Sequence, residues 1–313
     1  MRDHDIRGRT EKWAIAVDLG GTWIRAAAVS ESGTIAPIHR RETVAARPHD
    51  QILADLLALV DDATGDVTAR EGTVAGAGIG IATVLDTTGR TVPCPTLPTL
   101  GNLHLGDLIG ARAKIPAAVA NDAACFALGE FWMGTGKGCA NLCGITLGTG
   151  IGLGIVIDGR IYSGSHGFAG EIWATPVGDG CLEDHLSARA IEESYRRLSA
   201  RELAGAEIAE LAAAGDPEPV AAFLEFGRWL GTVVAFVANA LDPDVIVVGG
   251  SIARSFEVFR QPVMEALGTT TSPEAVRLEC SSLGESAALL GAAKLLWGQD
   301  VRTAHGARER DTG

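Results

Sequence analysis

Two segments of this chain share one design, and that repetition constrains the fold more than any other feature. Each is an apolar strand, a short turn of glycine and threonine, and a second apolar strand; they read AVDLGGTWIRAAAV from residue 16 and GITLGTGIGLGIVIDG from residue 144. Such self-similarity indicates internal duplication of one unit of strands and helices. Helical periodicity over 52–62 and 223–241 alternates with apolar strands over 74–81 and 244–248. Because strands that alternate with helices form parallel pairs covered by those helices, we predict a duplicated α/β protein.

A length of 313 residues allows two domains, each with its own core. We place a small N-terminal α/β domain at 12–118 and a larger C-terminal α/β domain at 119–298, and we expect the last helix, 286–297, to pack back on the first domain. The polar and patternless segments 1–11 and 303–313 are predicted to be flexible tails.

Charge and hydropathy disfavour several classes of partner. The net charge of −13 would repel the phosphates of a nucleic acid, and the basic clusters at Arg40-Arg41 and Arg196-Arg197 are short. No apolar run approaches the roughly 20 residues needed to cross a bilayer, and the charged start MRDHDIRGRTEK lacks the apolar region of a signal peptide. The six scattered cysteines favour free thiols over a disulfide framework. We therefore expect a cytoplasmic protein with neither a nucleic-acid nor a membrane partner.

The two glycine turns are candidate phosphate sites. Glycine lets a ligand approach the backbone closely, so that N–H groups can point at an anion. Either turn alone is equally well explained as a tight hairpin without a ligand, because glycine-rich hairpins are common. Together, one from each half, they fit a nucleotide site in which each half binds phosphates. The candidate residues are Gly20, Gly21, Thr22, Gly148, Thr149 and Gly150.

Five motifs in a fixed order resemble the motif series of the ROK family of sugar kinases and repressors, within the actin/hexokinase-like superfamily. They are DLGGT at 18–22, ND at 121–122, LGTG at 147–150, GFAGEI at 167–172 and GCLE at 180–183. The resemblance covers residues 13–297, and its specificity lies in the ordered set. It implies the actin/ribonuclease H-like duplicated fold, with a nucleotide and sugar cleft between two domains. It also implies a phosphotransferase with an alcohol group as acceptor, which uses ATP and Mg²⁺ and forms a homodimer.

The resemblance assigns the donor side of the site to both halves of the chain. It implies that Asp18 lies near Mg²⁺ and the phosphates, and that the two glycine turns hold the phosphates. Gly249 and Gly250 resemble the family's adenosine-contacting pair. Two simpler interpretations stay open: an aspartate that only caps a turn, and an ordinary strand-to-helix turn at the second glycine pair.

The acceptor side consists of four polar residues. The resemblance places Asp122 in the position of the general base, and it places Asn121, Asp122, Glu171 and Glu183 on the sugar hydroxyls. Phosphoryl transfer is loose, so the carboxylate mainly has to orient the hydroxyl in line with the γ-phosphate. The competing interpretations are local: Asn121-Asp122 caps the helix that follows, and Glu183 places a charge at a helix N-terminus.

The chain departs from the family's pattern at positions around the sugar. Trp173-Ala174 stands where Gly-His is expected, and Cys181 alone stands where the family has a cysteine-rich zinc segment. One thiol cannot form a four-ligand site, so we expect no zinc. Ala82-Thr83 replaces the common Pro-Gly, and Thr96 replaces an expected asparagine. These changes suggest a hexose other than plain glucose, such as the aminodeoxyhexose kanosamine, a substrate known in this family.

The leading interpretation is an ATP-dependent hexose 6-kinase, which phosphorylates the 6-hydroxyl of a glucose-like sugar. A sugar-responsive repressor would need a helix-turn-helix module before the first glycine turn, and residues 1–13 are too few for one. Two further functions stay open. One is that of a sugar-binding relative with a regulatory and non-catalytic role. The second is that of a glucokinase that uses polyphosphate, because the phosphate turns do not distinguish the donors.

Overall fold

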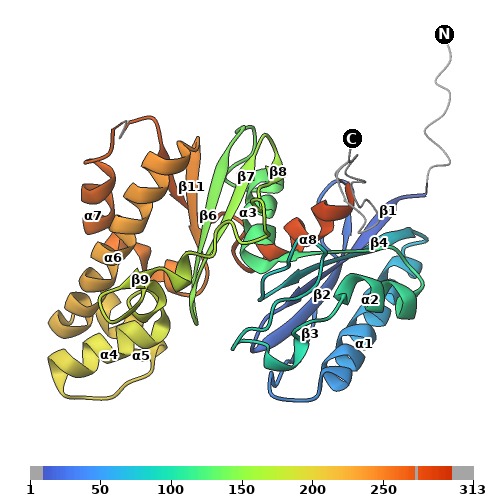
Figure 1. Ribbon diagram of the computed structural model, residues 1–313, viewed down its shortest axis with the longest axis horizontal. Helices are drawn as coiled ribbons and strands as arrows, with labels where there is room; N and C mark the ends of the chain where they lie inside the picture. Colours follow the sequence, from blue (N-terminus) through green and yellow to red (C-terminus); the bar gives the residue numbers. More distant parts are fainter. Residues whose placement is uncertain (1–9, 272–273, 298–313) are drawn as a thin grey trace, which may run out of the picture. The chain divides into compact units, whose positions relative to one another are not determined.

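The computed structural model describes residues 10–271 and 274–297, and these residues form two compact units (Figure 1). The first unit contains residues 10–125, 164–168 and 288–297. The second unit contains the remaining described residues. Each unit has its own hydrophobic core.

Two expectations from the sequence concern the limits of these parts. The tail predicted at 303–313 lies outside the described residues. So does the tail predicted at 1–11, except for its last two residues. The domain limits 12–118 and 119–298 stay a proposal, which can be tested by limited proteolysis of the purified protein.

A five-stranded sheet forms the middle of the first unit, in the order β3-β2-β1-β4-β5. Its strands are β1 (Lys12–Leu19), β2 (Trp23–Ser30), β3 (His39–Glu42), β4 (Thr73–Ile81) and β5 (Ala117–Asn121). The first three strands form antiparallel pairs, whereas β4 runs parallel to β1 and β5 runs parallel to β4. Helices α1 (His49–Thr68) and α2 (Leu105–Ala113) cover one face of this sheet, and α8 (Ala287–Trp297) lies on the other (Figure 1).

Alternate glycines in β4 explain how helices approach that second face so closely. A Cβ on Gly78 would lie 1.8 Å from the carbonyl oxygen of Ala292 in α8. A Cβ on Gly80 would lie 3.2 Å from Sγ of Cys125, in the first turn of α3 (Asp122–Met133). Because residues two apart share one face of a strand, these glycines leave that face bare for the helix backbones.

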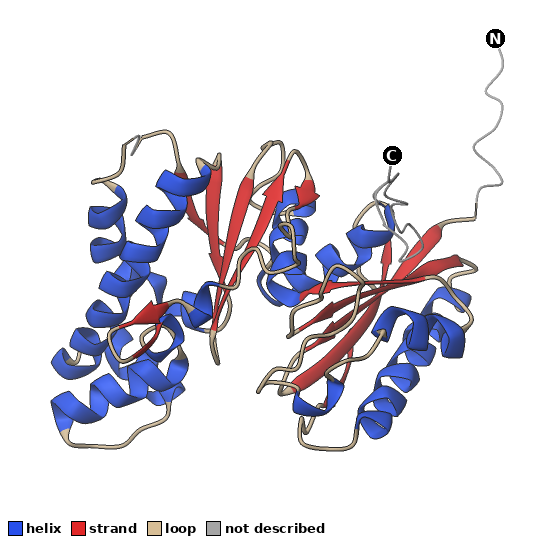
Figure 2. Cartoon of the chain, viewed as in Figure 1, coloured by secondary structure: helices blue, strands red, loops and turns tan. Residues whose placement is uncertain are grey.

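The second unit contains another five-stranded sheet, in the order β12-β11-β6-β7-β8. Its strands are β6 (Leu142–Leu147), β7 (Ile151–Ile157), β8 (Arg160–Ile161), β11 (Val245–Gly249) and β12 (Arg277–Cys280). A two-stranded hairpin, β9 (Pro176–Val177) and β10 (Gly180–Cys181), lies apart from it. Four helices gather on one side of the sheet (Figure 2): α4 (Ala188–Ser199), α5 (Gly205–Ala213), α6 (Pro217–Leu241) and α7 (Phe256–Leu267).

The two sheets have the same strand order, which confirms the predicted duplication. Read from corresponding edges, the orders are β3-β2-β1-β4-β5 and β8-β7-β6-β11-β12. In each sheet, three consecutive antiparallel strands are followed by two parallel strands. The repeated sequence segments form the strand pairs β1–β2 and β6–β7, so the two glycine turns occupy equivalent places in the two units.

Helix α6 corrects one expectation from the sequence. Within the described residues, this helix is long and apolar enough to cross a membrane by length and composition alone. Half of its most apolar window is buried inside the fold, as in the core helix of a globular protein. Its side chains Phe223 and Phe226 pack with Phe259 of α7, with ring centroids 5.8 and 5.5 Å apart.

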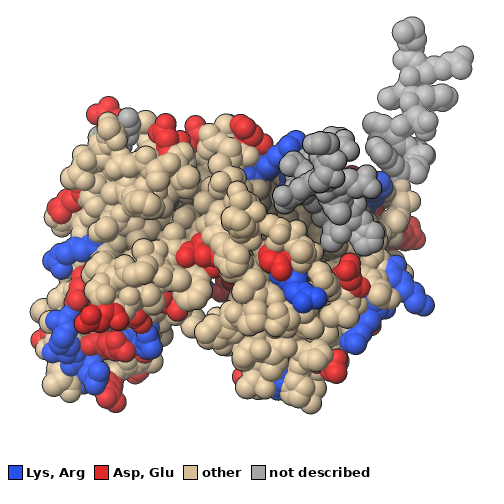
Figure 3. All heavy atoms as spheres, in the orientation of Figure 1, with Lys and Arg blue, Asp and Glu red and all other residues tan. Residues whose placement is uncertain are grey.

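The basic residues of α4 alternate with acidic ones and do not form a positive surface. Figure 3 shows both signs of charge gathered together over α4 and α5, at the lower left of the molecule. Arg197 forms an ion pair with Glu225, and Arg189 Nη2 lies 2.7 Å from Oδ1 of Asp184. These arginines are therefore already paired with carboxylates and do not form a basic patch. The absence of a nucleic-acid partner stays a prediction.

Candidate active site

The carboxyl ends of three parallel strands meet at one edge of the first sheet. In the register of β1, β4 and β5, Leu19 pairs with Ile81 and Ile81 pairs with Asn121. Ligand sites of α/β sheets form at this end of the strands, where the chain leaves them in loops. The first glycine turn and the Asn121-Asp122 pair therefore leave the same edge of the same sheet, although about 100 residues separate them in sequence.

Asp18 lies at this edge and is held by an arginine that the motif analysis missed. Its side chain is only 8% exposed and accepts a hydrogen bond from Nε of Arg25 at 3.0 Å, with a second contact from Nη2. Arg25 sits directly opposite Asp18 in the β1–β2 register. The sequence indicates this pair, because Arg25 is the charged residue that interrupts the second apolar strand, at the position opposite Asp18 across the turn.

Electrostatics place Asp18 and Asp122 around one buried thiol. Burial raises the pKa of Cys125 well above its ordinary value, and the negative charges of Asp122 and Asp18 raise it further. Both carboxylates are therefore close enough to Cys125 for their charge to act on it. Asp122 and the Arg25-paired carboxylate of Asp18 therefore lie near the same thiol at this edge of the first sheet.

Asn121 and Asp122 act as a helix cap, as the local interpretation proposes. Oδ1 of Asn121 accepts hydrogen bonds from the N–H groups of Ala123 at 2.9 Å and Ala124 at 3.1 Å. Its Nδ2 lies 3.3 Å from the carbonyl oxygen of Thr83. Oδ1 of Asp122 accepts a bond from the same Ala123 N–H at 2.8 Å. Capping fixes the place of both side chains and leaves a carboxylate at the N-terminus of α3, so a cap and a site residue are compatible roles here.

The second glycine turn lies beside the second glycine pair. Gly148 N–H donates to the carbonyl oxygen of Gly150 at 3.0 Å, and Thr149 between them is exposed. β6 runs parallel to β11 and pairs Thr146 with Gly249, so the two turns leave neighbouring strands at the same sheet edge. Gly250 has φ +90°, and a Cβ there would lie 2.2 Å from the carbonyl oxygen of Leu147. Only glycine fits that position.

Glu183 packs directly against the second glycine turn. A Cβ on Gly150 would lie 2.0 Å from Oε2 of Glu183, so the missing side chain makes room for the carboxylate. Burial raises the pKa of Glu183, and a hydrogen bond from the N–H of Ile151 offsets part of that rise. In the second unit, a candidate phosphate turn and a candidate sugar ligand are thus in contact.

Glu171 is half-buried and bonded to Trp173, one of the two residues at which the chain departs from the expected Gly-His pair. Nε1 of Trp173 donates to Oε2 of Glu171 at 2.6 Å. Burial raises the pKa of Glu171 above its ordinary value of 4.5, and the bond from Trp173 offsets only part of that rise. The chain reaches this position through Gly170, whose φ is +92° and whose Cβ would lie 2.1 Å from the carbonyl oxygen of Leu153.

Replacing Glu171 by glutamine is expected to stabilise the fold at pH 7. The raised pKa means that the folded state disfavours the charged form, so stability is lost as the pH rises from the unfolded pKa through the folded one. The gain should therefore be full at pH 7 and vanish by about pH 3, where the carboxyl is protonated in both states. Urea unfolding at the two pH values measures it, with Glu210→Gln on the exposed face of α5 as the control. A wild-type chain more stable than Glu171→Gln at pH 7 would contradict a raised pKa for Glu171.

Cys181 takes part in a polar contact with a nearby carboxylate. Oδ2 of Asp184 accepts a hydrogen bond from the N–H of Cys181 at 2.9 Å, and Sγ of Cys181 lies 3.4 Å from the same atom. These bonds lower the pKa of Asp184. Asp184 thus binds the last residue of the β9–β10 hairpin, in the segment where the resemblance implies zinc ligands. The expectation of no zinc stays a prediction.

Magnesium that arrives with a nucleotide fits the edge of the first sheet. Within the described part of the chain, no group of three or more His, Cys, Asp or Glu side chains could hold a metal ion without further ligands. Mg²⁺ keeps several waters and is usually bound by one or two carboxylates together with substrate phosphates. The buried carboxylate of Asp18, next to a glycine turn, suits that mode.

The candidate residues form two groups, one in each unit. The first unit contains Asp18, Gly20, Gly21, Thr22, Asn121 and Asp122. The second unit contains Gly148, Thr149, Gly150, Glu171, Glu183, Gly249 and Gly250. In the first unit, Asp18, the first glycine turn and the Asn121-Asp122 pair lie at the ends of neighbouring strands. In the second unit, the second glycine turn and the second glycine pair leave neighbouring strands, and Glu183 contacts Gly150.

Known proteins are similar to most of this chain. The model of the ROK family matches residues 14–299. A glucokinase from Streptomyces coelicolor is 30% identical over 90% of this chain and 96% of its own length. An N-acetyl-D-glucosamine kinase from Photobacterium profundum is 29% identical over 78% of this chain and 85% of its own. The crystal structure of a ROK family glucokinase from Streptomyces griseus, in complex with glucose and AMPPNP, is 29% identical, with a TM-score of 0.79 over 90% of this chain and 98% of that one.

Proposed function

The chain belongs to the ROK family, and from that premise we propose that it is an ATP-dependent hexose kinase that phosphorylates the 6-hydroxyl of its sugar. One observation carries the proposal. The carboxyl ends of β1, β4 and β5 bring Asp18, the Gly20–Thr22 turn and Asp122 to one edge of a sheet. Phosphoryl transfer needs a place for the metal, donors for the phosphates and a carboxylate for the hydroxyl, and these are the groups present.

On the donor side, the two glycine turns would bind the phosphates through their N–H groups. ATP is the expected donor, since the Streptomyces griseus relative was crystallised with its analogue AMPPNP. Mg²⁺ would neutralise charge on the phosphates, with Asp18 as its nearest protein carboxylate. Gly249 and Gly250, at the end of a strand next to the one that leads into the second glycine turn, would lie against the adenosine.

On the acceptor side, Asp122 would accept the proton of the sugar hydroxyl. Asn121, Glu171 and Glu183 would bind other hydroxyls, since carboxylates form strong and directional hydrogen bonds to them. Trp173 occupies one oxygen of Glu171, which leaves the other oxygen for the sugar. Trp173-Ala174 in place of the family's Gly-His pair supports a sugar other than plain glucose, and an aminodeoxyhexose such as kanosamine remains our proposal. A cytoplasmic homodimer is part of the same proposal.

An ADP-release assay over a panel of sugars tests the function. Purified protein with Mg-ATP would be given glucose, mannose, N-acetylglucosamine, N-acetylmannosamine and kanosamine. The panel would be repeated with polyphosphate in place of ATP, with the sugar phosphate itself measured, because polyphosphate releases no ADP. We expect sugar-dependent ADP release with at least one hexose. Turnover with polyphosphate alone would instead identify a polyphosphate-using glucokinase. Sugar binding without turnover from either donor would identify a non-catalytic relative.

The bond between Trp173 and Glu171 predicts a selective effect on the acceptor. Trp173→Phe keeps an aromatic ring but removes the N–H that holds Oε2 of Glu171, so KM for the hexose should rise about tenfold while KM for ATP stays unchanged. Trp13→Phe is the matched control. It removes an indole N–H near the start of β1, at the other end of that strand from Asp18. There, Nε1 of Trp13 has no hydrogen-bond acceptor among the described residues. Equal acceptor KM values for the two variants would contradict a role for Trp173.

A further inference from the structure

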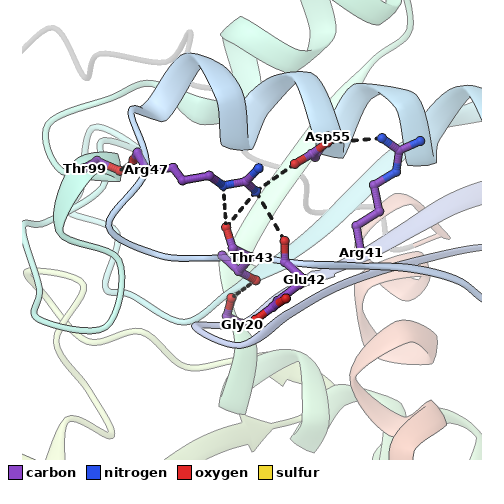
Figure 4. Close-up of polar contacts among 7 residues, drawn as sticks. All are labelled: Gly20, Arg41, Glu42, Thr43, Arg47, Asp55 and Thr99. Atoms are coloured by element: carbon purple, nitrogen blue, oxygen red, sulfur yellow. Dashed lines mark hydrogen bonds and ion pairs between the residues drawn. The ribbon is translucent and has the colours of Figure 1, made fainter.

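The segment that follows β3 packs against the first glycine turn through one buried threonine (Figure 4). Oγ1 of Thr43 donates to the carbonyl oxygen of Gly20 at 2.7 Å. The N–H of Thr43 donates to the carbonyl oxygen of Thr22 at 2.8 Å. The side chain is fully buried. One residue therefore holds both ends of the turn from Gly20 to Thr22.

These two bonds determine where the N–H groups of the turn point. A peptide unit is planar, and its C=O and N–H point in opposite directions. The carbonyl of Gly20 and the N–H of Gly21 belong to one peptide unit, so fixing the carbonyl toward Thr43 aims that N–H away from Thr43. Within the hairpin, the N–H of Gly20 donates to the carbonyl oxygen of Trp23 at 3.0 Å. Glycine has no side chain to restrict its own backbone, so the bonds from Thr43 add a restraint that the turn itself lacks.

Thr43 is itself held by an arginine on the same segment. Nη2 of Arg47 lies 2.8 Å from the carbonyl oxygen of Thr43, and Nε lies 3.2 Å from it. Oγ1 of Thr99 donates to the carbonyl oxygen of Arg47 at 2.8 Å. The segment between Thr43 and Arg47 also contains Val44, whose φ of +45° is rare for a β-branched residue and reverses the chain. The Arg47 side chain and Thr99, from another part of the first unit, thus restrain the backbone of this segment.

The arginine is anchored on α1 by a carboxylate that stays ionised. Oδ2 of Asp55 lies 2.7 Å from Nη2 of Arg47, and Oδ1 lies 3.1 Å from Nη1 of Arg41. Burial by itself would raise the pKa of Asp55, but the hydrogen bonds and charges of the two arginines outweigh it and lower the pKa. The chain of contacts from Asp55 through Arg47 to Thr43 therefore persists throughout the neutral pH range.

We propose that Thr43 is a positioning residue for the phosphate donor, which directs the N–H of Gly21 toward the phosphates of the nucleotide. The inference rests on the proposed function, because it takes the Gly20–Thr22 turn as a phosphate site. Thr43 touches neither reactant in this scheme. It acts through the turn, and its loss should weaken nucleotide binding without altering the sugar side.

Three variants and one control test this role in the full chain. Thr43→Val removes the hydroxyl and should raise the Kd for Mg-AMPPNP and KM for ATP about tenfold, with KM for the hexose unchanged. Thr43→Ser keeps the hydroxyl and should restore nucleotide affinity to within about twofold. Thr68→Val is the control, because its Oγ1 also donates to a backbone carbonyl, that of Thr64, on the exposed end of α1. It should leave all three constants unchanged.

Asp55→Asn, the third variant, keeps the test decisive if Thr43→Val does not fold. The asparagine side chain keeps one oxygen that can accept a bond from an arginine, but it has no charge. Like Thr43→Val, it should raise the nucleotide Kd, by about threefold. Thr43→Val that binds AMPPNP as tightly as the wild type, or that raises both KM values equally, would overturn the inference and leave the proposed function standing. A wild type that binds no AMPPNP would overturn the proposed function and this inference with it.

Discussion

Replacing Asp122 by asparagine is expected to reduce kcat by about 10³-fold while the Kd for AMPPNP stays within about twofold of the wild type. The carboxylate is needed to orient the sugar hydroxyl and to accept its proton, and an amide cannot accept that proton. Asparagine caps helices as well as aspartate does and has almost the same size, so α3 should keep its start. Single-turnover kinetics together with isothermal titration of AMPPNP measure the two effects separately.

Asp107→Asn is the matched control for that substitution. Asp107 is an acidic residue in the first turn of α2, so it has the same relation to a helix N-terminus as Asp122 has in α3. Both variants lose a charge that favours the helix start, worth roughly 0.3–1 kcal/mol, and only Asp122→Asn should lose turnover. An Asp122→Asn enzyme with near wild-type kcat would reduce Asp122 to a helix cap.

Replacing Gly250 by alanine is expected to cost roughly 3 kcal/mol or more in the free energy of unfolding. At φ +90° a side chain is strained, and the new Cβ would lie 2.2 Å from the carbonyl oxygen of Leu147. Leu147 is fully buried at the end of β6, so its backbone cannot move without disturbing the centre of the second sheet. Because Leu147 precedes the second glycine turn directly, nucleotide affinity should fall with stability. Urea unfolding and AMPPNP titration measure both.

Gly138→Ala separates backbone strain from the clash. Gly138 has the same φ of +90°, but a Cβ there would meet nothing within 4 Å. It should cost only about 1–2 kcal/mol, the strain of a left-handed backbone, and leave nucleotide binding unchanged. Equal destabilisation by Gly250→Ala and Gly138→Ala would show that the close approach of Gly250 to Leu147 adds nothing to the free-energy cost of the strained backbone.

The sequence predicts the duplicated fold well because the repeat has a direct physical expression. A strand, a glycine turn and a strand favour an antiparallel pair, and both copies form one in equivalent places of two sheets. Limits of elements are harder to predict. The helix expected over 223–241 begins at Pro217, because proline at the first helical position follows Asp216 as N-cap and extends the helix by almost two turns.

Residues that act through other residues leave no pattern in the sequence. Thr43 lies between Glu42 and Val44 in a segment without periodicity, and its contact with Gly20 crosses 23 positions. Arg25 could have been found, since it mirrors Asp18 across a turn whose register the glycines determine. The bond between Trp173 and Glu171 could not, because the orientation of an indole depends on the backbone turn at Gly170.

The phosphorus NMR spectrum of a completed reaction tests the central claim most directly. Purified wild-type protein would be incubated with Mg-ATP and the best hexose from the sugar panel, and phosphorus–proton correlation would identify the carbon that bears the new ester. We predict one sugar phosphomonoester coupled to the protons on C6, formed in equal amount with ADP. ATP that persists unchanged beside a bound sugar, or ADP that appears only with free phosphate, would contradict the assignment of this chain as a hexose 6-kinase.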